Sequence, residues 1–127
     1  MSKVFVLRTH ALLSSRESTL KFGNDNEIVI PFEVLKELRH LKHESTEKKK
    51  IAKDLLRYIL DLPTERLMSK EGVVQENGSI LRVSKDYKDI RIDSADDLTI
   101  PQKRTLQICL GIKDKENKTV IYTILYK

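Results

Sequence analysis

The sequence lacks several features that mark whole classes of protein. It has one cysteine, Cys109, which excludes an internal disulfide and any metal site built from cysteines alone. No apolar run approaches the roughly 18 residues of a membrane span, and the N-terminus does not resemble a signal peptide. There is no glycine-rich phosphate loop, no nucleophile elbow and no zinc-ligand spacing. We therefore expect a cytoplasmic protein without membrane contact, in which Cys109 is a small buried helix residue.

The composition fits one small, mildly basic domain. The 127 residues are enough for a single core, so we expect one domain over residues 1–127. Lysine and arginine exceed aspartate and glutamate by 24 to 19, a net charge of +5. Such a domain attracts polyanions, including RNA and DNA, although the excess alone does not demonstrate that partner. The four tyrosines are spread along the chain and form no aromatic platform for RNA bases.

Apolar periodicity predicts strands that alternate with helices. Continuous apolar runs predict buried strands at residues 3–7, 28–30 and 120–125. Helical spacing of apolar residues is found at residues 31–41, 44–62 and 101–112, and residues 9–22 fit a short helix and a loop. The predicted order is strand, helix, strand, two helices, hairpin, helix, strand.

Turn and cap signals divide these elements. Pro31 ends the second strand near the start of a helix, and Thr46 is expected to cap the next helix. Asn77-Gly78 predicts a hairpin turn with positive φ at both positions. Residues 85–100 are expected to form a loop, and Gly111 to weaken the end of the last helix.

The order of elements predicts a three-layer α/β domain. Its central sheet is mostly parallel, is flanked by helices, and carries a small hairpin. In open α/β sheets, chemistry takes place just beyond the carboxyl ends of strands. Arg8, Thr9 and His10 follow the first strand directly and are candidate site residues for that reason.

Four segments, in order, resemble the PIN domain, with the best likeness to the PIN domain at the N-terminus of PhoH-like proteins. In the second segment a strand ends in Ile30-Pro31, and the following helix carries Glu37 between apolar residues. The likeness covers residues 3 to about 123 and implies a PIN-like fold. The segments are residues 3–13, 27–42, 103–110 and 119–123.

This resemblance implies a metal-dependent endoribonuclease with a reduced set of acids. PIN nucleases gather about four carboxylates around Mg²⁺ or Mn²⁺, which activates water against a phosphodiester. Glu37 matches one of these acids, so it is the implied metal ligand and first candidate catalytic residue. Arg8 stands where the family has its first acid, and Gln102 where it has its third. Asp96 or Asp97 could substitute if their loop folds back, which makes Asp97 the second candidate catalytic residue.

The C-terminal part of the resemblance is incomplete. The fourth family acid should follow the last strand, where the chain has Thr123-Ile124-Leu125. The family also continues with a further helix and an edge strand, so the resemblance is to a degenerate and C-terminally truncated PIN domain. Because Arg8 places a permanent positive charge in the site, we expect an Arg8–Glu37 ion pair to replace the metal.

Charged side chains give a second set of candidates. Arg8, Thr9, His10, Gln102 and Arg104 are the candidate nucleic-acid contacts. Two further groups of charged residues can be interpreted either as a solvated helix face or as a binding site. Glu37, His40, His43 and Glu44 could hold a metal, and Lys48–Lys50 with Lys53 and Arg57 could follow phosphates.

Three functional classes therefore remain open from the sequence. The first is a Mg²⁺- or Mn²⁺-dependent endoribonuclease that uses Glu37 with Asp96 or Asp97. The second is a degenerate PIN domain that binds RNA without cutting it, and the acid inventory favours this class. The third is an interaction module that pairs with another protein, or with a second copy as a homodimer, through an exposed sheet edge.

Overall fold

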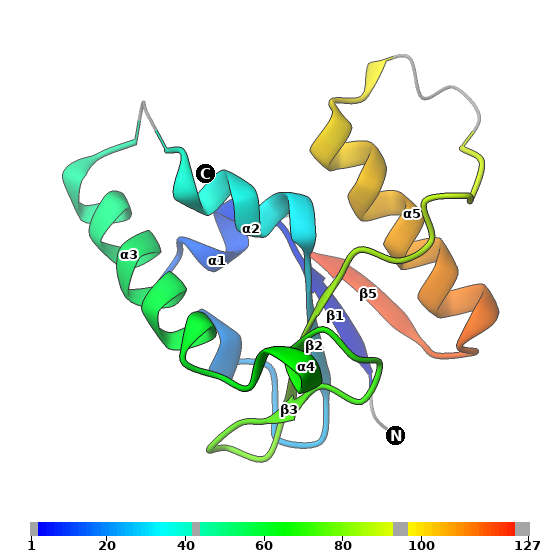
Figure 1. The fold of residues 1–127 in the computed structure, drawn as a ribbon, viewed down its shortest axis with the longest axis horizontal. Coiled ribbons are helices and arrows are strands. Elements are labelled where there is room, and N and C mark those ends of the chain that lie inside the picture. Colours follow the sequence, from blue (N-terminus) through cyan, green and yellow to red (C-terminus); the bar gives the residue numbers. More distant parts are fainter. Residues whose placement is uncertain (1–2, 42–43, 93–96, 124–127) are drawn as a thin grey trace.

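The computed structural model describes residues 3–41, 44–92 and 97–123 (Figure 1). No helix in this part of the chain is long and apolar enough to cross a membrane. The elements are β1 (Val4–Leu7), α1 (Thr9–Leu12), the 3₁₀ turn η1 (Ser18–Leu20), β2 (Glu27–Pro31), α2 (Phe32–Arg39), α3 (Thr46–Leu60), α4 (Thr64–Leu67), β3 (Val73–Val74), β4 (Ile80–Ser84), α5 (Ile100–Lys115) and β5 (Val120–Thr123).

Within the described residues, the sheet has the strand order β3-β4-β2-β1-β5. The strands β4, β2, β1 and β5 are parallel, and β3 pairs antiparallel with β4. Phe5 in β1 lies between Ile28 of β2 and Ile121 of β5, its register partners on the two neighbouring strands. The predicted α/β fold with a mostly parallel sheet is confirmed.

Helices cover both faces of the sheet, and the strand residues alternate between them. Val6 and Val29 pack with Ile108 of α5 on one face. Leu7 and Ile28 pack on the other face, against α1, α2 and α3. Figure 1 shows α3 and α5 on opposite sides of the sheet. Continuous apolar runs in β1 and β2 are the consequence of this double burial.

Cys109 lies on the α5 side of the sheet, where it is buried as the sequence predicts. Burial raises the pKa of its thiol to about 12, so the thiol stays neutral at physiological pH.

The helices differ from the prediction in three places. Ser45, and not Thr46, caps α3, because its hydroxyl accepts a hydrogen bond from the Lys48 amide at 3.2 Å. The short helix α4 after Pro63 carries no periodic pattern and was not predicted. Gly111 does not end α5, which continues to Lys115. Gly111 is instead needed for close packing, because a Cβ there would overlap the Tyr87 ring.

The hairpin between β3 and β4 is confirmed, but its predicted turn type is wrong. Only Gly78 of the turn dipeptide has a positive φ, at 89°. The Gln75 amide donates to the Ser79 carbonyl at 2.7 Å, and the Gly78 amide donates to the Gln75 carbonyl at 2.9 Å. This closes a three-residue loop in which a glycine takes the left-handed position.

A buried group of charges joins β2, β4 and the end of α5. Arg82 in β4 is 1% exposed, and its Nη2 donates to Glu116 Oε2 at 2.9 Å. Its Nε lies 3.0 Å from Glu27 Oε2 as an ion pair, although the N–H does not point along that line. Lys118 Nζ contacts Glu27 Oε1 at 2.9 Å, and Tyr87 donates to Glu116 at 2.6 Å. Two cations and two carboxylates thus neutralise one another within the packed structure.

The loop after β4 is tied to α5 by two buried polar side chains. Arg104 Nη2 donates to the carbonyls of Lys85 and Asp86 at 3.1 and 3.2 Å, and Nη1 donates to Gln107 at 2.6 Å. Gln107 in turn donates to the carbonyls of Lys88 and Ile90 at 3.0 and 2.8 Å. Burial lowers the pKa of Arg104, but the guanidinium stays charged at any physiological pH. Arg104 therefore holds backbone in place.

We expect Glu116→Gln to lower the free energy of unfolding by about 2 kcal/mol at pH 7, because charged hydrogen bonds to Arg82 and Tyr87 are lost. Burial alone raises the pKa of Glu116, but these hydrogen bonds outweigh it and hold the pKa below its ordinary value. A lowered pKa stabilises the fold above the ordinary carboxyl value of about 4.3.

The difference between wild type and Glu116→Gln should accordingly shrink as the pH falls below that value. Urea unfolding at pH 7 and at low pH measures it. Glu71→Gln, at an exposed glutamate, is the control and should leave the stability unchanged. A difference that persists undiminished in acid would contradict this assignment.

Arg104→Met should lower the free energy of unfolding by about 2 kcal/mol, because backbone carbonyls of the 85–90 loop lose their charged donor. The neighbouring Lys103 is exposed, so Lys103→Met is the matched control. Thermal unfolding of both variants makes the comparison. Equal stability of the two variants would show that the loop does not depend on Arg104.

Candidate functional site

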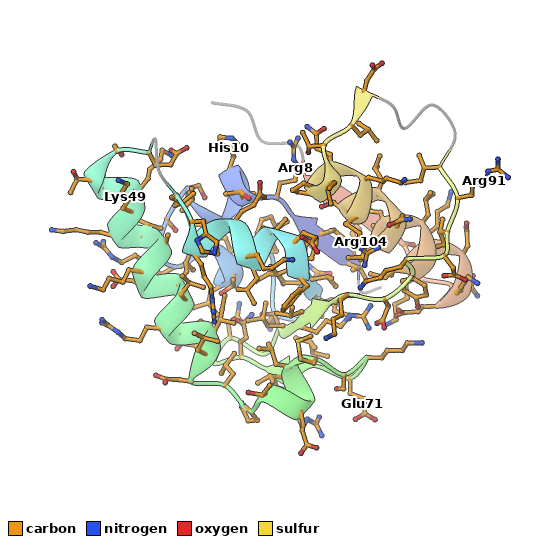
Figure 2. All side chains as sticks on the ribbon, turned by 45° about the horizontal axis from the view of Figure 1, so that its top comes forward. Arg8, His10, Lys49, Glu71, Arg91 and Arg104 are labelled. Carbon is orange, nitrogen blue, oxygen red and sulfur yellow. The ribbon has the colours of Figure 1, made fainter. Side chains whose placement is uncertain are left out.

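A cleft of about 740 Å³ lies at the carboxyl end of β1 and β2. Three parts of the chain line it: residues 8–10, one side of α2 together with His40, Leu41 and Glu44, and the start of α5. In Figure 2, Arg8 and His10 lie along the upper side of the molecule, where α1 and α2 meet. The position agrees with the general location of sites in open α/β sheets.

The parallel pairing of β1 and β2 brings the two halves of the site together. Leu7 ends β1, and Arg8 adopts an extended conformation as the N-terminal cap of α1. Thr9 begins α1 and faces α2, where its Oγ1 donates to Glu37 Oε1 at 2.6 Å. The 28 residues between Thr9 and Glu37 make this a tertiary contact that spacing alone could not reveal. A hydrogen bond to a carboxylate is short because the acceptor carries charge.

Arg8 lines the same cleft and is half-buried. Among the ion pairs of the described residues, none within 4.0 Å joins Arg8 to Glu37. The partner of Glu37 is the Thr9 hydroxyl, and the expected Arg8–Glu37 pair is not formed. The guanidinium thus contributes a permanent positive charge to the cleft that is not paired with the Glu37 carboxylate.

Gln102 uses its side chain to close the start of α5. Its Oε1 accepts from the Thr99 amide at 3.0 Å, and its own amide donates to Thr99 Oγ1 at 3.3 Å. These two bonds form a capping box, which satisfies two backbone donors at the helix start. The site therefore has a neutral, helix-capping amide at this position.

The structure brings five of the expected site residues into one cleft and leaves two outside it. Thr9, His10 and Gln102 line the cleft together with Arg8 and Glu37. Asp97 is exposed and does not line it. Arg104 does not line it either and holds the 85–90 loop. Asp96 and His43 lie outside the described residues.

Two charged lining residues, Glu33 and Lys36, were not predicted as site residues. Glu33 and Lys36 of α2 face the cleft and form an ion pair at 3.1 Å. Glu44 also lines it, so the cleft has three carboxylates against two permanent cations, Arg8 and Lys36. The signal was present for Glu33, which precedes Glu37 by four residues and so shares its helix face.

The donors that line the cleft within the described residues do not fit a tightly held Mg²⁺ or Mn²⁺. Glu37 already accepts a hydrogen bond from Thr9, and Glu33 is paired with Lys36. Within residues 3–41, 44–92 and 97–123, no three histidine, cysteine, aspartate or glutamate side chains group as a metal site. These cations require several convergent oxygen ligands. What the cleft offers instead is a mixture of hydrogen-bond donors, cations and short apolar surfaces.

A family model for the PIN domain matches residues 5–124, which extend from β1 to the end of β5. Comparison with curated proteins and with solved structures gave no match. The match covers nearly the whole sequence, and it agrees with the mostly parallel sheet and its flanking helices. The match supports a PIN domain, but it does not support a specific relationship to PhoH-like proteins. The chain belongs to the PIN domain family.

Proposed function

We propose that this PIN domain binds single-stranded RNA in the cleft and does not cut it by metal-dependent hydrolysis. One observation carries the proposal: Arg8 lines the cleft at the position where the family resemblance places the first acid. A carboxylate at this position would attract a divalent cation, whereas a guanidinium attracts a phosphate.

The lining residues support contacts to a nucleotide chain. Arg8 can donate two hydrogen bonds to one phosphate, and the exposed His10 lies next to it in sequence. Leu41 and Pro101 supply apolar surface for a sugar or a base. Single strands are favoured over duplexes as partners, because unstacked nucleotides can enter a cleft that a helix cannot.

Glu37 has a different role in this proposal. Bound by Thr9, it is a fixed carboxylate that repels a phosphate and accepts hydrogen bonds from an RNA hydroxyl or an exocyclic amine. It therefore orients the strand. The alternative role, as one of a pair of catalytic acids with Asp97, has no support from the geometry, because Asp97 does not line the cleft.

Other expectations remain proposals of the same rank. The PhoH-like relationship depends on the Ile30-Pro31 strand end and the helix that follows it. The cytoplasmic location, with RNA as the partner, is consistent with the basic composition. Pairing with a second copy or another protein through a sheet edge is the competing proposal for the partner, and the oligomeric state of the purified protein tests it.

The proposal predicts RNA binding that is independent of divalent metal. A labelled single-stranded RNA should bind equally in Mn²⁺, Mg²⁺ and EDTA and should stay intact in all three. Arg8→Met should weaken binding by at least about tenfold, since a charged hydrogen bond to phosphate contributes about 1.5–3 kcal/mol and 1.4 kcal/mol is a factor of about ten.

Arg91→Met is the matched control, because Arg91 is exposed and does not line the cleft (Figure 2). It should bind RNA nearly as well as the wild type. Metal-dependent cutting that disappears in Glu37→Ala would contradict the proposal and establish a working nuclease.

A further inference from the structure

Helix α3 carries a row of cations on its outer side, which we call the α3 basic face: Lys49, Lys50, Lys53 and Arg57. All four side chains are exposed. The opposite side of the helix packs into the core through Ile51, Ala52, Leu55 and Ile59. At 100° per residue, the four cations lie on one side of the helix, and no carboxylate lies between them.

The cations of the α3 basic face form no close ion pair with carboxylates of the described residues. None of its four side chains takes part in an ion pair within 4.0 Å among the described residues. The nearest carboxylate on the helix flank, Asp54, is bound by Arg16 from another segment. The hydrogen bond from Arg16 is the largest cause that lowers the pKa of Asp54, and the nearby charges of Arg57 and Lys53 lower it further. Asp54 thus offsets part of the charge of the face from its flank, and the rest is left to solvent or to a ligand.

The α3 basic face starts beside the cleft. Glu44 lines the cleft, and α3 begins two residues later at Thr46. In Figure 2, Lys49, His10 and Arg8 follow one another across the upper part of the molecule. From Lys49 to Arg57 the helix rises by about 12 Å. A chain that leaves the cleft on the side of Glu44 therefore meets this row of cations.

We propose that the α3 basic face is a second contact surface for RNA, a track for the sugar–phosphate backbone that continues from the cleft. This second proposal depends on the proposed function only because both take RNA as the partner. The cleft itself has more carboxylates than permanent cations, so most neutralisation of phosphates must come from outside it. Lys49, Lys53 and Arg57 recur every four residues, about 6 Å along the helix axis, which suits successive phosphates of an extended strand.

A membrane surface fits the α3 basic face less well. Helices that lie on membranes insert an apolar side between lipid headgroups. The apolar side of α3 is already buried in the core, with Leu55 and Ile59 fully inaccessible. The face also lacks an aromatic side chain that could stack on a base, so its contacts to RNA are to phosphates and do not depend on sequence.

The experiment compares a triple variant, Lys49→Gln, Lys53→Gln and Arg57→Gln, with a matched triple control. The control, Lys88→Gln, Lys113→Gln and Lys115→Gln, removes the same charge from exposed positions elsewhere. Both are tested against a 4-nucleotide and a 12-nucleotide single-stranded RNA over a range of salt concentrations, beside Arg8→Met.

The α3 variant should bind the 12-mer about tenfold more weakly and the 4-mer as the wild type does. For the 12-mer, the plot of log affinity against log salt concentration should become less steep by about 2. Each of the three lost phosphate contacts contributes about 0.7 to this slope on a single strand. The control should change both by much less. Equal losses in the two triple variants would reduce the effect to net charge and overturn the track.

The remaining outcomes separate this proposal from the proposed function. Weakening of the 12-mer by the α3 variant but not by Arg8→Met would support the track and contradict the cleft. Weakening by Arg8→Met alone would do the reverse. Loss of binding to anionic phospholipid vesicles in the α3 variant, with RNA affinity unchanged, would assign the surface to membranes and overturn the track.

Discussion

The parallel pairing of β1 with β2 determines where every other part of the site lies. Both strands are buried on two faces, so a shift of one residue would send Val6 and Val29 into the wrong layer. The register is therefore firmly set, and it places the end of β1 beside the start of α2. The contact between Thr9 and Glu37 follows from that register. On the other face, α5 begins at the same edge and completes the cleft.

This scaffold is that of a PIN domain, and its cleft combines carboxylates, cations and a helix-capping amide. A shared fold positions a site without deciding what the site does. Arg8 brings a cation to the cleft, and the Gln102 amide is used to cap a helix. The carboxylate of Glu37 accepts a hydrogen bond from the Thr9 hydroxyl. Positive charge is concentrated outside the cleft: exposed cations without close ion pairs lie along α3, while carboxylates outnumber permanent cations in the cleft.

Sequence periodicity was sufficient for the layers and for the buried strands β1 and β2, because residues buried on two faces leave continuous apolar runs. It also placed Arg8 and Thr9 directly after the first strand, and Glu37 on the helix that follows the second. It could not give the partner of Glu37, since contacts across 28 residues depend on tertiary packing. The buried role of Arg104 was missed for a similar reason: its partners are backbone carbonyls, which leave no trace in residue types. The short α4 escaped because one turn shows no period.

We propose that Arg8 and Gln102 close the cleft to divalent metal, and Mn²⁺ binding followed by electron paramagnetic resonance tests this without any need for activity. The wild type should show no saturable binding, whereas the double variant Arg8→Asp with Gln102→Asp should bind Mn²⁺ saturably. Arg91→Asp with Asn24→Asp makes the same change of net charge at two exposed positions outside the cleft and is the control for surface charge. Saturable wild-type binding of Mn²⁺ that disappears in Glu37→Ala would contradict the account.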